Sequence, residues 1–178
     1  WKGWHLPIQA IAKLPLEMRS RVEFHLWGPE QHDADSQAFS NELKGFISQN
    51  NLQETVFLHG ATTKVVESLQ SGHFVIVASE NEPCSVSLME SLALGLPALA
   101  ARSGGNVDIV KDGETGILFE NGSAEDLKNK IISILNGKVN IRPAVEIRES
   151  VRGWAAGTMT AKYNRIYDHM AQLNSIKL

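Results

Sequence analysis

The sequence predicts an α/β protein: a three-layer, Rossmann-like domain in which helices cover both faces of a parallel sheet. Two observations support this prediction. Segments with strand character alternate almost strictly with segments that have the helical period. In addition, residues 74–78 form an uninterrupted apolar run between polar turns. Such a run is typical of a strand that is covered on both faces, as strands of a parallel sheet are.

The first half of the chain contains three of the expected strands. Apolar residues at helical spacing predict a helix over 6–14, which Pro15 ends. Further helices are expected over 36–50 and 65–69 for the same reason. The expected strands cover 22–27, 56–58 and 74–78, and Gly28 and Gly60 follow the first two.

The second half continues the alternation. Helical spacing predicts a helix over 85–94, stopped by Gly95, and a short helix between 105 and 112. Strands are expected over 98–100 and 116–119. Ser123, with Asp126 three residues later, predicts the start of a helix that runs to about residue 136. From Pro143 onward the pattern indicates two helices divided near 154–157.

Length and composition indicate one domain, residues 1–178, and exclude several classes of protein. The chain has 178 residues, of which 43% are hydrophobic and 21% charged, so it is expected to fold around its own core. The formal net charge is −3 and no basic run stands out, which argues against a nucleic-acid partner. No stretch approaches the roughly 20 apolar residues of a membrane-spanning helix. The single cysteine, Cys84, has no partner for an internal disulfide, which fits a reducing, cytoplasmic setting.

The loop after the 74–78 strand is the expected ligand site, because open parallel sheets bind ligands at the carboxyl ends of their strands. Glu82 precedes the next helix and Glu90 lies inside it, so their carboxylates can flank one small molecule. The backbone N–H groups of residues 84–87 would be first-turn donors suited to a phosphate. This succession suits a nucleotide-sugar. Carboxylates near a helix N-terminus are also favoured by the helix dipole without any ligand, so the spacing alone leaves both readings open.

Longer motifs resemble one family over nearly the whole chain. The segment Glu82-Pro-Cys-Ser-Val-Ser-Leu-Met-Glu90 is similar to the Glu-x7-Glu motif of retaining, family 4 glycosyltransferases of the GT-B fold, also called glycosyl transferases group 1. The blocks 91–97 and 104–116 resemble the segments that follow this motif in the family. Lys2-Gly3 and residues 56–60 match its Lys-Gly start and mid-domain strand. The resemblance implies the C-terminal, donor-binding half of a GT-B enzyme, with an N-terminal acceptor domain outside this chain.

The resemblance also implies a role for each matching residue. Glu90 would bind the ribose hydroxyls of the donor, and Glu82 would act catalytically beside the donor sugar, where positive charge develops. Lys2 would bind the diphosphate. The sugar and diphosphate would meet the loop and its backbone N–H groups at Cys84, Ser85, Val86 and Ser87.

The implied reaction is transfer of a sugar from a nucleotide-sugar donor, with retention of configuration. The donor is a substrate, and no cofactor is expected. No metal is expected either, because cationic side chains and a helix N-terminus would take the role that a divalent ion has in metal-dependent transferases. The acceptor would be a sugar, a lipid-linked sugar or a polysaccharide, held by the other domain. In the full-length protein, peripheral attachment at the inner face of a membrane would involve that other half.

Two other functions stay open at this stage. One is a different GT-B enzyme, such as a nucleotide-sugar epimerase or a sugar phosphorylase, although the Glu-x7-Glu block argues against the epimerase. The other is a non-catalytic nucleotide-sugar binding module, which Cys84 and Ser85 support because the family commonly has an aromatic residue and a glycine there. Cys84 is interpreted as a small packing residue and not a nucleophile. His59 is interpreted either as a satisfied polar residue or as a contact to the base.

Overall fold

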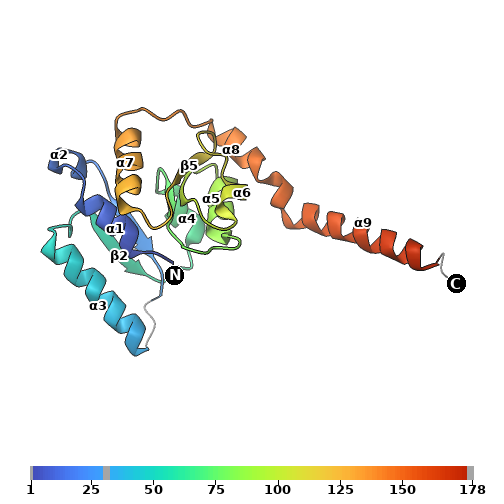
Figure 1. Ribbon diagram of the computed structural model, residues 1–178, viewed down its shortest axis with the longest axis horizontal. Helices are drawn as coiled ribbons and strands as arrows, with labels where there is room; N and C mark the ends of the chain where they lie inside the picture. Colours follow the sequence, from blue (N-terminus) through green and yellow to red (C-terminus); the bar gives the residue numbers. More distant parts are fainter. Residues whose placement is uncertain (1, 30–32, 176–178) are drawn as a thin grey trace.

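The structure is a computed structural model that describes residues 2–29 and 33–175 (Figure 1). Its elements confirm the expected alternation of strands and helices. In chain order they are α1 (His5–Ala12), α2 (Leu16–Arg19), β1 (Phe24–Trp27), α3 (Ala34–Gln49), β2 (Val56–Gly60), α4 (Val65–Gln70), β3 (Val75–Val77), α5 (Val86–Ala93), β4 (Ala98–Ala101), α6 (Asn106–Ile109), β5 (Gly116–Phe119), α7 (Ala124–Leu135), α8 (Ala144–Ser150), the 3₁₀ turn η1 (Arg152–Trp154) and α9 (Ala156–Ser175).

All strand pairs of the described residues are parallel, which confirms the predicted class. The strands form two hydrogen-bonded sheets, β1–β2 and β3–β4–β5, where one continuous sheet was expected. The segment that follows Lys2 lies between the ends of these sheets. A Cβ atom on Gly3 would lie 2.1 Å from the carbonyl oxygen of Ala78, which follows β3. Likewise, a Cβ on Gly28, which follows β1, would lie 2.3 Å from the ring of Trp4.

The apolar side chains form two clusters, one on each face of the three-stranded sheet. Strand β4 is buried throughout, and its residues alternate between the clusters: Leu99 joins one and Ala98 the other. The first cluster also holds α1, α3 and α7, and it includes Val56 of β2, so it spans both sheets. The second holds α5, α6 and α8. This is the three-layer arrangement that the sequence predicts.

Side-chain caps start three of the helices, namely α3, α5 and α7. Ser123 accepts a hydrogen bond from the Asp126 N–H at 3.1 Å, which confirms the start that the sequence predicts for α7. Asp33 caps α3 by accepting a hydrogen bond from the Ser36 N–H at 2.9 Å. Hydrogen bonds from the Ser36 hydroxyl and from this N–H lower the pKa of the Asp33 carboxyl. Each cap satisfies an N–H group that the helix itself leaves without a partner.

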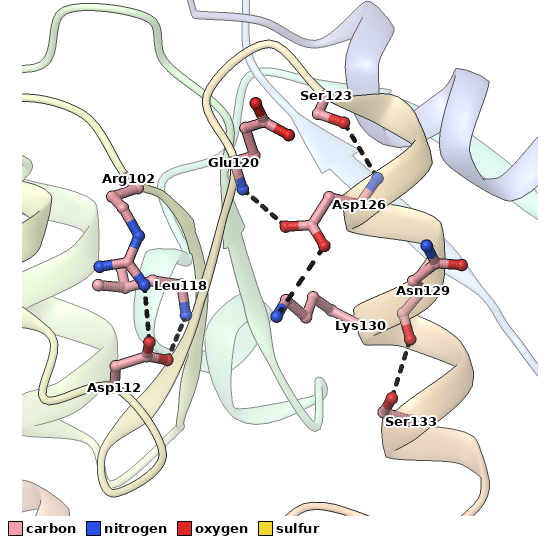
Figure 2. Close-up of polar contacts among 9 residues, drawn as sticks. All are labelled: Arg102, Asp112, Leu118, Glu120, Ser123, Asp126, Asn129, Lys130 and Ser133. Atoms are coloured by element: carbon pink, nitrogen blue, oxygen red, sulfur yellow. Dashed lines mark hydrogen bonds and ion pairs between the residues drawn. The ribbon is translucent and has the colours of Figure 1, made fainter.

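Two carboxylates cap the outer edge of β5 (Figure 2). Asp112 accepts a hydrogen bond from the Leu118 N–H at 2.8 Å, and Asp126 accepts one from the Glu120 N–H, also at 2.8 Å. Arg102 lies 2.8 Å from the Asp112 carboxylate, which offsets its charge. Because these N–H groups are paired, this edge is a poor template for adding another strand.

One helix of the structure is absent from the sequence-based prediction. The four-residue helix α2 follows Pro15, and its length is too short for a hydrophobic period to indicate it. The expected division of the C-terminal region appears as η1 between α8 and α9. Figure 1 shows α9 projecting away from the body of the protein, with Tyr163, Ile166 and Met170 exposed.

We expect Asp126→Ala to destabilise the protein by about 1–3 kcal/mol, because the Glu120 N–H and Lys130 would lose their carboxylate partner. The measurement is chemical denaturation monitored by circular dichroism. Glu125→Ala is the matched control, since Glu125 lies in the same helical turn but makes only surface ion pairs in the described part of the chain. Equal effects of the two substitutions would contradict the proposed role of Asp126.

Candidate functional site

The candidate site lies on the loop of residues 79–85, which joins the carboxyl end of β3 to the start of α5. Glu82 lies in this loop with only 8% of its side chain exposed. Its carboxylate is 2.9 Å from the ammonium group of Lys2, whose side chain is 50% exposed. The structure therefore brings together two of the residues that the sequence points to, although they are 80 positions apart.

The Glu82 loop is held by the loop that follows β4. The Gly105 N–H donates a hydrogen bond to the Glu82 carbonyl at 2.9 Å. Gly104 has φ +51°, and a Cβ atom there would lie 2.3 Å from the same carbonyl oxygen. A Cβ on Gly105 would lie 2.3 Å from the Pro83 carbonyl oxygen. The two glycines are therefore required by the close approach of the two backbones.

Two further side chains hold the same loop, and the sequence reasoning did not identify them. The hydroxyl of Ser103 and the side-chain amide of Asn121 both donate to the Glu80 carbonyl, the latter at 3.4 Å. Ser103 follows β4 and Asn121 follows β5. Both residues follow the carboxyl ends of neighbouring parallel strands, the edge of the sheet where the sequence predicts a ligand site. That position did not distinguish these two residues from others at the same edge.

Ser85 begins α5 as its N-cap and is buried. Its hydroxyl oxygen accepts a hydrogen bond from the Leu88 N–H at 3.3 Å and lies 3.2 Å from the hydroxyl of Ser87. Val86, the first residue of the helix, is 61% exposed. The N-terminal end of α5 therefore opens to solvent, where the partial positive charge of the helix is available to an anion.

The other two site residues of this segment are exposed. Cys84 has an exposed thiol side chain, so its interpretation as a packing residue is wrong: it sits on the outer side of the loop and not in the core. Glu90 lies on the exposed face of α5. The two carboxylates of the motif therefore occupy different environments, since Glu82 is buried in an ion pair and Glu90 faces solvent.

His59 belongs to a stack of rings on the β1–β2 sheet. Its ring lies 4.6 Å from that of Trp27 and 5.1 Å from that of His25, between centroids. His25 joins the His59 ring nitrogen at 2.8 Å and the Glu23 carboxylate at 3.1 Å. These contacts agree with the interpretation of His59 as a satisfied polar residue.

Two clefts lie elsewhere on the surface. One, of about 460 Å³, is at the carboxyl end of β5, and the other, of about 310 Å³, lies beside α8. The lining of both clefts omits Lys2, Glu82 and Glu90. Within residues 2–29 and 33–175, no three His, Cys, Asp or Glu side chains gather as metal ligands do. In the same described residues, every helix is too short or too polar to cross a bilayer.

The sequence of residues 1–152 matches the family model described as Glycosyl transferases group 1. The chain belongs to this family. This is the family that the sequence motifs resemble, so the expected family membership is confirmed.

Two curated relatives are about a quarter identical to this chain over the aligned residues. It is 27% identical, over 130 residues, to poly(ribitol-phosphate) alpha-N-acetylglucosaminyltransferase of Staphylococcus aureus, covering 72% of this chain and 25% of that protein. It is 26% identical, over 162 residues, to N-acetyl-alpha-D-glucosaminyl L-malate synthase of Bacillus anthracis, covering 90% and 40%. The chain thus spans less than half the length of these relatives.

Solved structures agree with the GT-B, Rossmann-like fold. HepE of Anabaena in complex with UDP superposes with a TM-score of 0.77 at 23% identity, covering 97% of this chain and 46% of that one. A glycosyltransferase of Rickettsia africae superposes with a TM-score of 0.82 at 21% identity, covering 96% and 45%. At these identities the likeness establishes the fold.

We expect Gly105→Ala to destabilise the protein by about 1–3 kcal/mol, because its new methyl group would collide with the Pro83 carbonyl and displace the Glu82 loop. Gly45→Ala is the control: Gly45 lies within α3 with no atom within 4 Å of a new Cβ, so alanine should stabilise the helix by about 0.5–1 kcal/mol. Denaturant unfolding of both variants checks this, and an unchanged stability of Gly105→Ala would show that the two loops do not pack as described.

Proposed function

We propose that this chain is the donor-binding domain of a retaining, metal-independent glycosyltransferase of family 4 that uses a nucleotide-sugar. The observation that carries the proposal is the Lys2–Glu82 ion pair beside the open N-terminus of α5. A buried carboxylate, a cation that reaches it from the start of the chain, and an exposed helix N-terminus together supply what a sugar diphosphate needs. Family membership supports the reaction class, and structural neighbours solved with UDP support the donor class.

Binding follows from the chemistry of each residue. The exposed Glu90 carboxylate accepts hydrogen bonds from the two ribose hydroxyls. Lys2 and the backbone N–H groups of residues 85–87 bind the diphosphate, while Cys84 lines the entrance on the exposed side of the loop. Cationic and dipolar groups therefore take the part that a divalent ion plays in metal-dependent transferases.

The reaction breaks the bond between the anomeric carbon and the diphosphate oxygen. The electron pair leaves with the nucleoside diphosphate, whose negative charge Lys2 and the α5 dipole stabilise. The sugar ring becomes cationic, and the Glu82 carboxylate stabilises it. The acceptor hydroxyl oxygen then bonds to the anomeric carbon on the same face of the ring, and its proton passes to the departing diphosphate oxygen.

The acceptor side of the proposal rests on the length of the relatives. The chain spans less than half of each, so a second domain would hold a sugar, lipid-linked or polysaccharide acceptor. The site would then lie in the cleft between the two domains, in the cytoplasm or at the inner face of a membrane.

Calorimetric titration with UDP, GDP and ADP tests the donor site. We expect one nucleotide to bind saturably and Glu90→Ala to weaken its binding about ten- to hundredfold, because charged hydrogen bonds to the ribose are lost. Glu17→Ala, an exposed carboxylate on α2, is the control and should leave affinity unchanged.

If the full-length protein binds none of the three nucleotides, the donor-site proposal fails. Undiminished binding to Glu90→Ala would remove Glu90 from the site but keep the proposal. Tight binding of the nucleotide-sugar without transfer to any acceptor, in the full-length protein, would favour the non-catalytic binding module.

A further inference from the structure

The Lys2–Glu82 pair is unequally buried. The Glu82 side chain is 8% exposed and the Lys2 side chain 50%, with 2.9 Å between carboxylate and ammonium. A carboxylate so deeply buried needs a compensating cation, because losing its hydration is costly. The ammonium, by contrast, remains within reach of a ligand from solvent.

The two partners also differ in freedom to move. The backbone of Glu82 is fixed by the Gly105 N–H and by close contact with Gly104. Lys2 carries its charge on a flexible four-carbon stem with three rotatable N–H donors. Its neighbour Gly3 is packed against the Ala78 carbonyl, so the stem and not the backbone would change position.

We propose that Lys2 changes partner when the donor binds: it neutralises Glu82 in the free protein and moves to the diphosphate in the complex. This inference rests on the proposed function, in which Lys2 binds the diphosphate. A diphosphate carries more negative charge than one carboxylate and competes successfully for the ammonium. Glu82 is then left without its cation next to the donor sugar.

The exchange ties catalysis to occupancy of the site. In the free protein the Glu82 charge is compensated, so the loop is stable without substrate. In the complex the positive charge that develops on the sugar ring takes the place of the ammonium beside Glu82. The carboxylate is thereby prepared to stabilise the transition state more strongly than the bound donor.

A double-mutant cycle on the full-length protein tests the exchange, with UDP affinity measured by calorimetry. Glu82→Gln keeps the shape of the side chain and releases Lys2 from the ion pair, so UDP should bind about three- to tenfold more tightly. Lys2→Met should bind UDP more weakly. In the Lys2→Met background, Glu82→Gln should leave UDP affinity unchanged, because no ammonium remains to be released.

That last comparison separates partner exchange from simple repulsion between Glu82 and the phosphates. If Glu82→Gln tightens binding equally in both backgrounds, or does not tighten it in the wild-type background, partner exchange is wrong while the donor site stands. If the wild-type protein does not bind UDP or another nucleoside diphosphate, the proposed function itself fails.

Lys2→Met leaves Glu82 buried without its cation, so this variant requires a check of folding by circular dichroism. Should it not fold, a crystal structure of the wild-type protein with UDP decides the matter. We expect the Lys2 ammonium within hydrogen-bond distance of a phosphate oxygen and more than 4 Å from the Glu82 carboxylate. An ion pair that stays at its present distance would overturn the exchange.

Discussion

The contact between the Gly104–Gly105 backbone and the Glu82 loop is the constraint on which the site depends. Strands β3 and β4 are parallel neighbours, so the loops that follow them emerge at the same edge of the sheet. They approach so closely that a methyl group on either glycine would meet a carbonyl oxygen. This contact fixes the backbone of Glu82, and the fixed backbone holds the carboxylate against Lys2. A carboxylate held in a fixed position is suited to the proposed role of Glu82, because preorganised groups stabilise developing charge best.

Local patterns account for the parts of the fold that the sequence predicted. The buried run of β4, the Ser123 cap of α7 and the stop at Gly95 each depend on residues close together in the chain. The division into two sheets depends instead on which strands pair, and pairing is decided by contacts between distant segments. The packing of Gly3 against Ala78 is of that kind. Hydrophobic periodicity indicates local secondary structure and cannot indicate such a contact between distant segments.

The candidate site was likewise predicted only where residues close together in the sequence define it. Order and spacing of the family motifs identified Lys2, Glu82 and Glu90, because those blocks are continuous in sequence. They did not indicate that Glu82 is buried in an ion pair, nor that Ser103 and Asn121 hold its loop, since those contacts join the ends of three strands. Exposure of Cys84 was missed for a related reason: a small apolar side chain in a loop packs inward or outward according to its neighbours in space.

The different environments of the two motif carboxylates suit different tasks. Glu90 is exposed to water, which already compensates its charge. In the proposed complex it would accept hydrogen bonds from the uncharged ribose, and its electrostatic environment would change little. Glu82 has lost most of its hydration, and electrostatic interactions there act through a less polar surrounding. A change in nearby charge therefore affects Glu82 far more than Glu90. In the proposed reaction, the residue that responds to the arrival of an anion is therefore also the one beside the bond that breaks, and burial of the Glu82 side chain accounts for both properties.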